Sequence, residues 1–191
     1  MQKQKIVNYP MVNPTPIVII GVEVNGKSNF TTIGAFGVVC EGPIFYISLK
    51  RTHLSNAGVK ENGYFSINIP SVDQMQKTDY VGLISGRNVD KSTVFESFFG
   101  SMDKAPMINE CPVNMLCKLV KTADLPDRDL FFGEVLETYV NDEFVNDGVL
   151  DFAKINPLLL TMNGSGNFSF WKLGEVVGAA YKEGKTLIKS Q

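Results

Sequence analysis

The stretch Ile17-Val-Ile-Ile-Gly-Val-Glu-Val-Asn-Gly-Lys-Ser-Asn-Phe-Thr-Thr-Ile33 is the strongest indicator of the fold in this sequence. Ile17 to Val24 is rich in β-branched residues, which favour an extended strand. Asn25-Gly26 follows, and this dipeptide is typical of a two-residue β-hairpin turn. We therefore predict that Ser28 to Cys40 returns as an antiparallel partner strand.

Further strand patterns continue beyond the hairpin. They are rich in β-branched or alternating apolar residues and occupy residues 44–49, 64–69, 113–121, 130–140 and 158–162. Helical composition is confined to short segments between strands, at 52–62, 71–84 and 90–98. Strands without regularly alternating helices argue against a doubly wound parallel sheet. We predict a mainly β fold, an antiparallel β-barrel with short flanking helices, in a single domain over residues 1–191.

Two strands carry more specific expectations. In Tyr64–Ile69 the alternation predicts that Phe65, Ile67 and Ile69 face the core and that Ser66 and Asn68 face outward. In Leu130–Val140 the glycine at position 133 indicates a bulge or a close backbone approach.

Composition excludes several classes of function. The chain has 18 Lys and Arg against 20 Asp and Glu, so nothing favours nucleic acid as a partner. No apolar run approaches the roughly 20 residues of a membrane span. Paired zinc-ligand spacings are absent, and the single histidine lacks the sequence context of a catalytic triad. We expect no metal, no catalytic side chain, no nucleic acid and no membrane.

The cysteines indicate the cellular compartment in which the protein works. Cys40, Cys111 and Cys117 form no CxxC pair and leave one residue unpaired. Buried or half-buried free thiols in a reducing cytoplasm are the expected state. We predict a cytoplasmic protein.

Three longer stretches carry a resemblance. They are the hairpin extended to Asn13–Ile33, the segment Gly42–Ser55 running on into Glu61–Pro70, and Gly86–Ser92 followed by Ala105–Asn114. In this order and spacing they resemble the flavin reductase-like domain family, and within it the flavoredoxin-type branch, from about Tyr9 to Gly174. The resemblance implies an FMN-binding split β-barrel that forms a homodimer, with the flavin near the subunit interface.

For the flavin ring, the resemblance points to the hairpin and the residues after it. Small polar groups or backbone N–H groups are needed at the edge of the ring. The candidates are Asn29, Thr31, Thr32 and the backbone at Ala35, Phe36 and Gly37. The alternative is a polar hairpin end with ordinary strand threonines.

For the phosphate, the candidate segment is Ser48-Leu-Lys-Arg-Thr-His-Leu-Ser55, which follows a strand and opens a helix. Unpaired N–H groups at a helix N-terminus favour a phosphate, and charged donors strengthen the contact. Where Ser55 stands, the family usually has threonine, and the hydroxyl is kept. The candidates are Ser48, Leu49, Lys50, Arg51, His53 and Ser55; the alternative is a solvated basic turn.

Two more candidates come from the resemblance and from aromatic content. Asp90-Lys91 matches a recurrent pair of the family on the flavin side of the barrel, with surface solvation as the alternative for Lys91. Trp171 stands beside Phe168 and Phe170, and it either covers the ring or the nicotinamide by stacking or packs in the core.

These observations predict an FMN-dependent oxidoreductase, a flavin reductase that takes hydride from NADH or NADPH as a transient donor. The cofactor carries the chemistry, and the protein orients it. Two alternatives need the same pocket. One is a flavoredoxin-like carrier that exchanges electrons with a protein partner, and the other is a non-catalytic flavin-binding module for storage or sensing.

Overall fold

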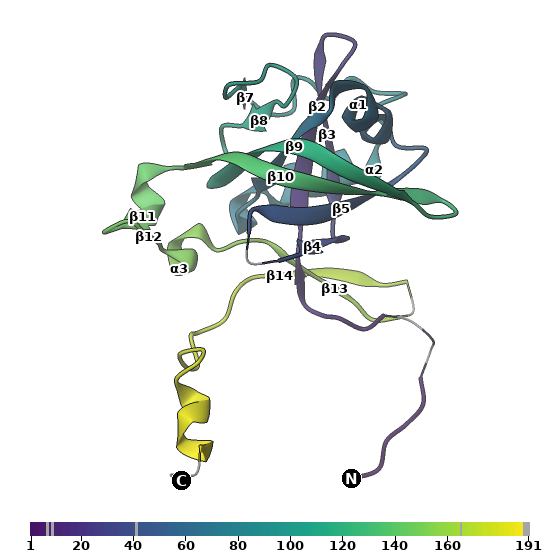
Figure 1. Ribbon diagram of the computed structural model, residues 1–191. Helices are drawn as coiled ribbons and strands as arrows, with labels where there is room; N and C mark the ends of the chain where they lie inside the picture. Colours follow the sequence, from purple (N-terminus) through teal and green to yellow (C-terminus); the bar gives the residue numbers. More distant parts are fainter. Residues whose placement is uncertain (7, 9, 41, 165, 189–191) are drawn as a thin grey trace.

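The central element of the structure, a computed structural model, is a seven-stranded antiparallel sheet that curls into a half-barrel (Figure 1). The structure describes residues 1–6, 8, 10–40, 42–164 and 166–188. The strand order is β3-β2-β6-β9-β10-β5-β4. The bounds are β2 Val18–Val24, β3 Lys27–Ile33, β4 Phe36–Val38, β5 Ile44–Lys50, β6 Tyr64–Ile69, β9 Val113–Asp124 and β10 Arg128–Val140.

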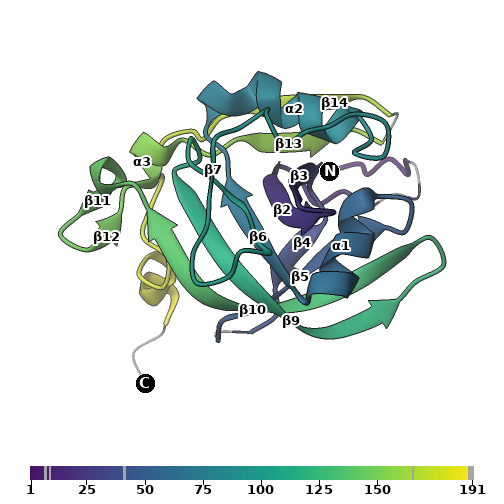
Figure 2. The same ribbon diagram turned by 90° about the horizontal axis from the view of Figure 1, so that it is seen from above.

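Shorter elements surround this sheet. A second sheet has the order β1-β13-β14, and β7 with β8 and β11 with β12 form small pairs. Figure 2 shows β13 beside β14 and β11 beside β12. The strand bounds are β1 Thr15–Pro16, β7 Ser97–Phe98, β8 Met107–Ile108, β11 Val145–Asn146, β12 Val149–Leu150, β13 Leu159–Met162 and β14 Phe168–Trp171. The helices are α1 Leu54–Asn62, α2 Met75–Leu83 and α3 Phe152–Ile155, with 3₁₀ turns η1 Val72–Gln74, η2 Asp142–Phe144 and η3 Glu183–Leu187. The mainly β antiparallel fold with short flanking helices is confirmed.

The hairpin forms as the sequence predicts, but its second strand is shorter. Val18 lies opposite Ile33, and the turn residues Asn25 and Gly26 both have positive φ, 54° and 77°. Positive φ at both positions is what the two-residue turn requires. The expectation of one strand from Ser28 to Cys40 was wrong. The chain leaves β3 after Ile33, and β4 pairs with β5 at the other edge of the sheet.

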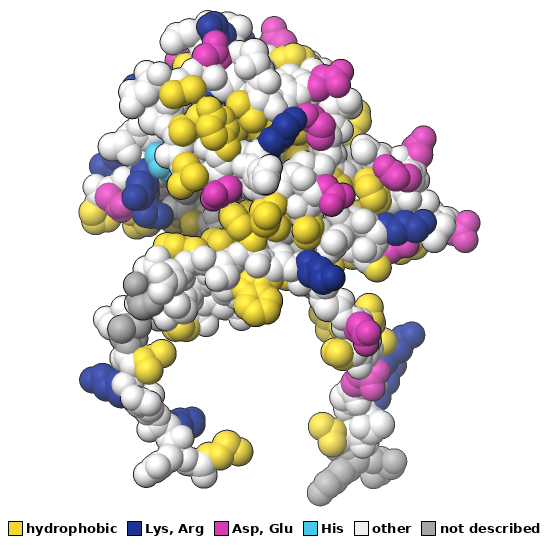
Figure 3. Space-filling model, turned by 180° about the vertical axis from the view of Figure 1, so that it is seen from behind, with side chains coloured by type: hydrophobic (Ala, Val, Ile, Leu, Met, Phe, Trp, Pro, Cys, Tyr) yellow, Lys and Arg dark blue, Asp and Glu magenta, His cyan; other side chains and the backbone are white. Residues whose placement is uncertain are grey.

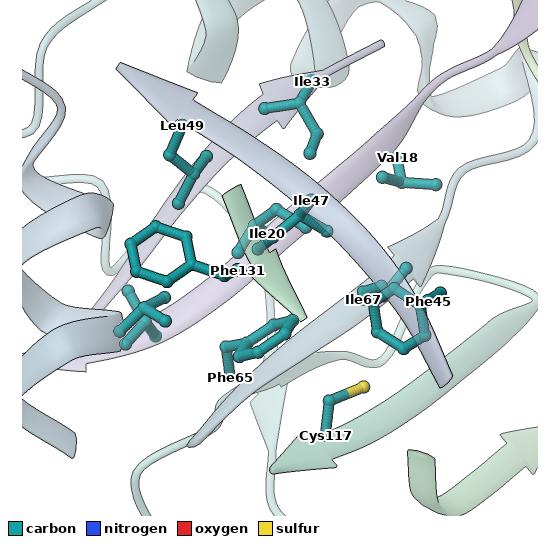
Figure 4. Packing of buried hydrophobic residues seen from close by; sticks show 12 residues of the cluster. Val18, Ile20, Ile33, Phe45, Ile47, Leu49, Phe65, Ile67, Cys117 and Phe131 are labelled. Carbon is teal, nitrogen blue, oxygen red and sulfur yellow. The ribbon is translucent and has the colours of Figure 1, made fainter. Parts of the chain in front are cut away.

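The main core lies on the concave face of the sheet. Apolar side chains from β2, β3, β5, β6, β9 and β10 meet there, with α1 contributing Val59 (Figure 4). The Phe45 and Phe65 rings meet edge to face at a centroid distance of 6.1 Å. A Cβ on Gly133 would lie 2.7 Å from Cζ of Phe65, and the register of β10 shifts at this point. The register shift agrees with the predicted bulge at Gly133, and the group that approaches the glycine closely is the Phe65 side chain, not another backbone segment.

The outward placement of Ser66 and Asn68 was wrong. Both are fully buried, because the chain around β7 and β8 covers the second face of β6. Asn68 donates to the carbonyl of Ile19 at 3.0 Å and accepts from the N–H of Ile108 at 2.9 Å. A strand with both faces covered holds polar residues only when they are hydrogen-bonded.

The expected helix over residues 90–98 is also absent. This segment runs through turns into β7. Its apolar residue Phe95 packs edge to face on Phe30 at 5.5 Å. Tertiary anchoring therefore overrides the weak local helical preference.

The other two helical predictions are confirmed. α1 ends at Gly63, which has φ of 69° and forms the left-handed C-cap. Ser71 and Gln74 form a capping box before α2.

The three cysteines are free, with Cys111 and Cys117 buried and Cys40 exposed, so the expectation of burial was wrong for Cys40. In the described part of the chain, no helix has the length and apolar character to cross a membrane.

Candidate functional site

Three neighbouring cavities follow β3 along the side of the barrel. The central cavity, of about 200 Å³, lies between β3, the start of α1 and the chain after α2. The basic cavity, of about 350 Å³, shares the wall formed by Asn29, Leu54, Gly86 and Lys91 with it. The aromatic cavity, of about 390 Å³, meets the central cavity at Gly82 and Leu83 and is lined by Phe168 and Phe170. The central cavity therefore adjoins the other two and shares lining residues with each.

β3 supplies the polar wall of the central cavity. Asn29 and Thr31 both line it, because alternate residues of a strand share one face. Asn29 donates from its amide nitrogen to Oγ of Ser55 at 2.8 Å, which ties β3 to the first turn of α1. A Cβ on Gly86 would collide with Oδ1 of Asn29, so glycine is needed for this close approach.

The N-terminus of α1 opens into the central cavity. His53 is its N-cap, with extended backbone and no side chain capping the first-turn N–H groups. The N–H of Asn56 donates to the carbonyl of His53 at 3.1 Å, whereas the N–H groups of Leu54 and Ser55 precede the first carbonyl that the helix could offer them. Nδ1 of His53 is buried and has no hydrogen-bond partner among the described residues. Unpaired donors at a helix N-terminus form an anion site.

Lys91 places a cation in the same cavity. Its side chain is buried, and Nζ donates to the carbonyls of Phe30 at 3.0 Å and Val81 at 2.7 Å. An ammonium group has three donors, so one N–H is left for a ligand. Burial lowers the pKa of Lys91 to about 8, so the charged form predominates at neutral pH.

His53 has a lowered pKa in the unliganded protein. Burial is the main cause, and the positive charges of Lys50, Lys91 and Arg128 add to it (Figure 3 shows the histidine in cyan, with basic side chains beside it). We predict that NMR titration of this single histidine gives a pKa below 6.5 without ligand and a higher one with FMN, because a bound dianion favours imidazolium.

The sign of the effect on stability follows from the same shift. As the pH falls, the imidazole of His53 takes up its proton at higher pH in the unfolded chain than in the folded chain. The contribution of neutral His53 to the free energy of unfolding is therefore present above about pH 6.5 and is lost below it. An unliganded pKa at or above 6.5, or no change with FMN, would contradict this placement of the anion.

The structure brings five of the predicted site residues together in the central cavity. These are Asn29, Thr31, His53, Ser55 and Lys91. Thr32 lines the aromatic cavity, and its hydroxyl donates to the carbonyl of Thr78 in α2.

The remaining predicted ring contacts lie elsewhere. Phe36 and Gly37 line a separate apolar cavity of about 300 Å³. The carbonyl of Ala35 accepts the N–H of Ser48 at 2.9 Å. Trp171 is half exposed and donates from Nε1 to Oγ1 of Thr161 at 2.7 Å, so it stands apart from the three cavities along β3.

The residues of the predicted basic turn also lie in different surroundings. Leu49 is part of the main core, and Oγ of Ser48 is buried without a partner in the described part of the chain. Lys50 is exposed, and Arg51 pairs with the buried carboxylate of Asp129 at 3.1 Å. Neither basic residue lines the central cavity. Their role as phosphate donors stays a prediction.

The sequence reasoning missed the end of α2 and the chain that follows it. Gly82, Leu83, Ile84 and Ser85 line the central cavity, and Arg87 lines the basic one. In the sequence analysis, Gly86–Ser92 carries part of the family resemblance, but Lys91 is its only candidate site residue, and the end of the preceding helix supplies none. The missed signal is the polar run Ser85-Gly-Arg-Asn88, which places donors and an arginine next to Asp90-Lys91.

Comparison with known proteins decides the family. The model of the flavin reductase like domain matches residues 11–164. The chain belongs to this family. Among solved structures, flavoredoxin from Methanosarcina acetivorans is similar at 39% identity and a TM-score of 0.93, covering 98% of this chain and 100% of that one.

Two further structures have this fold. Flavoredoxin of Desulfovibrio vulgaris (Miyazaki F) is 25% identical with a TM-score of 0.88, covering 96% of this chain and 100% of that one. An FMN-binding protein from Thermus thermophilus is 20% identical with a TM-score of 0.76, covering 94% and 98%. The resemblance to the flavin reductase-like family and the split barrel that it implies are thus confirmed.

The residues of the central cavity fit the flavin of a flavin reductase-like domain. The uncapped α1 terminus, the unpartnered Nδ1 of His53 and the Lys91 ammonium suit a phosphate. The aromatic cavity offers an apolar wall of the kind that a planar ring requires.

Proposed function

We propose that this protein binds FMN along β3, with the phosphate at the N-terminus of α1 and the ring toward the aromatic cavity. The observation that carries the proposal is the uncapped start of α1, which opens into the same cavity as the buried Lys91. The net charge of the chain is −2, so a dianion depends on such local donors.

The protein residues bind and orient the cofactor. The first-turn N–H groups of Leu54 and Ser55 and the free N–H of Lys91 are the phosphate donors. Asn29 and Thr31 line the middle of the site and suit the polar ribityl chain. Phe168 and Phe170 provide the apolar surface for the ring. Bound FMN supplies the redox chemistry, accepting hydride or single electrons.

We further propose an NAD(P)H-dependent FMN oxidoreductase. Hydride transfer to a flavin needs alignment of donor and ring, and no protein acid or base is required. Anaerobic stopped-flow mixing of the FMN-loaded protein with NADH, and separately with NADPH, tests it. We expect at least one of the two nicotinamides to bleach the 450 nm band at least about tenfold faster than it bleaches free FMN at equal concentration. The reason is that the protein would hold the nicotinamide beside the flavin, whereas in solution the two meet only by random collision.

The second candidate is an electron carrier, and the likeness to two flavoredoxins favours it. In that case neither nicotinamide bleaches the bound flavin faster than free FMN, while dithionite reduces it fully. Reduction by dithionite in the same preparation shows that the flavin is accessible, so slow bleaching would count against the reductase and for the carrier.

A further inference from the structure

The turn between β2 and β3 contains a chemically reactive pair of residues, Asn25-Gly26. Asparagine is thermolabile because a backbone nitrogen can attack its side-chain amide, and a following glycine has no side chain to shield that nitrogen. The chain has three Asn-Gly pairs, at positions 25–26, 62–63 and 163–164. The structure gives the first two very different surroundings.

The side chain of Asn25 is free to react. Asn25 is exposed, and none of the described residues forms a hydrogen bond with its side-chain amide. A Cβ built on Gly26 would have no heavy atom of the described residues within 4 Å. The turn therefore leaves room for solvent on this side of the Gly26 backbone.

The attacking nitrogen, in contrast, is restrained by Glu23. The N–H of Gly26 donates to the carboxylate of Glu23, which also accepts Nζ of Lys104. Hydrogen bonds from Lys104 and Gly26 lower the pKa of Glu23, so this carboxylate is ionised at neutral pH. Its side chain is only 14% exposed. A charged acceptor holds a backbone N–H more strongly than a neutral one does.

The pair Asn62-Gly63 is restrained at both of its reacting groups. The amide nitrogen of Asn62 donates to the carbonyl of Glu23 at 2.7 Å. The N–H of Gly63 donates to the carbonyl of Val59 at 3.0 Å, as part of the C-cap of α1. Asn62 can react only after the end of α1 has opened, so its rate of reaction reports whether this part of the fold is intact.

We propose that Asn25 is a deamidation site and that Glu23 restrains its reaction. The nitrogen of Gly26 forms a bond to Cγ of Asn25, and the proton of its N–H passes to a solvent base. The bond between Cγ and Nδ2 of Asn25 breaks, and Nδ2 leaves as ammonia after taking a proton from water. Water then opens the resulting succinimide ring at either carbonyl, which gives aspartate or isoaspartate.

The Glu23 carboxylate opposes the first step in two ways. The N–H of Gly26 must leave its charged acceptor before the nitrogen can turn toward Cγ of Asn25. The negative charge of Glu23 also disfavours the deprotonated nitrogen that attacks. The reaction places a new carboxylate in the wall of the basic cavity, which position 25 lines together with Lys27. Isoaspartate also lengthens the backbone of the two-residue turn that sets the register of β2 with β3.

Peptide mapping by mass spectrometry tests the proposal on the purified full chain, incubated at mildly alkaline pH as wild type and as three variants. We expect Glu23→Ala to lose the Asn25 amide about tenfold faster than the wild type or more, because the variant frees the N–H from a charged acceptor. Lys104→Met removes the exposed ion pair and leaves the bond from Gly26 to Glu23 in place. It should raise the rate by less than about threefold.

Glu110→Ala is the matched control. Glu110 likewise accepts a lysine, Lys77 at 2.9 Å, and a backbone N–H, that of Glu96 at 3.2 Å, but no Asn-Gly pair lies in its turn. This variant should lose Asn25 at the wild-type rate. The pair at 163–164 follows β13, on the far side of the barrel from the hairpin tip (Figure 1), and should keep one rate in every variant.

Faster loss of Asn25 alone in Glu23→Ala supports the proposal. An unchanged rate at Asn25 in that variant overturns it. Equal acceleration in Lys104→Met, or loss of the Asn62 amide together with that of Asn25, also overturns it, because general loosening of the structure then explains the reaction.

Discussion

Replacing Lys91 by methionine should weaken the binding of FMN about a hundredfold and that of riboflavin only a few-fold. Lys91 is the buried cation of the central cavity, and its free N–H is the charged donor that we assign to the phosphate. A hydrogen bond to a charged group contributes about 1.5–3 kcal/mol, and loss of the long-range attraction adds to it. Methionine keeps most of the length and apolar bulk of the lysine chain.

The comparison with riboflavin separates charge from structure. Lys91→Met also removes the donors to the carbonyls of Phe30 and Val81, which tie β3 to α2. A loss from that cause affects both flavins equally, because riboflavin lacks only the phosphate. Fluorescence titration with each ligand gives the two dissociation constants, and their ratio reports the phosphate contact.

The pH profile provides an independent measure of the same contact. Since burial lowers the pKa of Lys91 to about 8, the affinity of the wild type for FMN should fall above about pH 8, and that of Lys91→Met should not.

The double variant K50A/R51A tests the location of the phosphate that the sequence suggests, on the basic turn. If it loses FMN a hundredfold while Lys91→Met does not, the phosphate lies on the basic turn.

Replacing Asp129 by alanine should lower the free energy of unfolding by about 3 kcal/mol. The carboxylate is fully buried and accepts hydrogen bonds from Asn56 at 2.8 Å, Lys60 at 2.7 Å and Arg51 at 3.1 Å. These bonds fasten the basic turn and both halves of α1 to β10. Arg51 and Lys60 are half exposed and regain water in the variant, so the loss stays below the sum of the three bonds.

Asp127 is the matched control, because its carboxylate is exposed and, among the described residues, pairs with its neighbour Arg128 alone. Asp127→Ala should change stability by less than about 0.5 kcal/mol. Urea unfolding of both variants measures the difference. Equal effects at the two positions would show that the buried network stabilises the fold no more than a surface pair does.

The sign of the pH dependence at Asp129 follows from its environment. Burial on its own would raise its pKa, but hydrogen bonds from Lys60, Asn56 and Arg51 outweigh burial and leave the pKa below its usual range. The stability from this carboxylate is therefore complete above about pH 4, the unfolded value, and is lost as the pH falls further. Asp129→Ala should show a weaker loss of stability below pH 4 than the wild type.

The sequence alone determined the features that depend on neighbouring residues. Asn25-Gly26 predicts the hairpin turn because few residues accept positive φ, and Gly63 predicts the end of α1 for the same reason. The strand succession predicts the antiparallel barrel. The stretches that carry the family resemblance include Asn29, Thr31 and the start of α1, which line one cavity in the structure.

Tertiary structure decided what depends on residues far apart in the chain. Ser66 and Asn68 are buried because a later segment covers the second face of β6, which their alternation does not reveal. Arg51 donates a hydrogen bond to Asp129, 78 positions along the chain, and does not line the central cavity. Gly86 and Arg87 line the cavities in a loop that is held by hydrogen bonds from Arg87 to the carbonyl of Thr52 and from Lys91 to that of Val81. Local periodicity reports which face of a segment is apolar, whereas the packing of distant segments determines what covers that face and which charges meet.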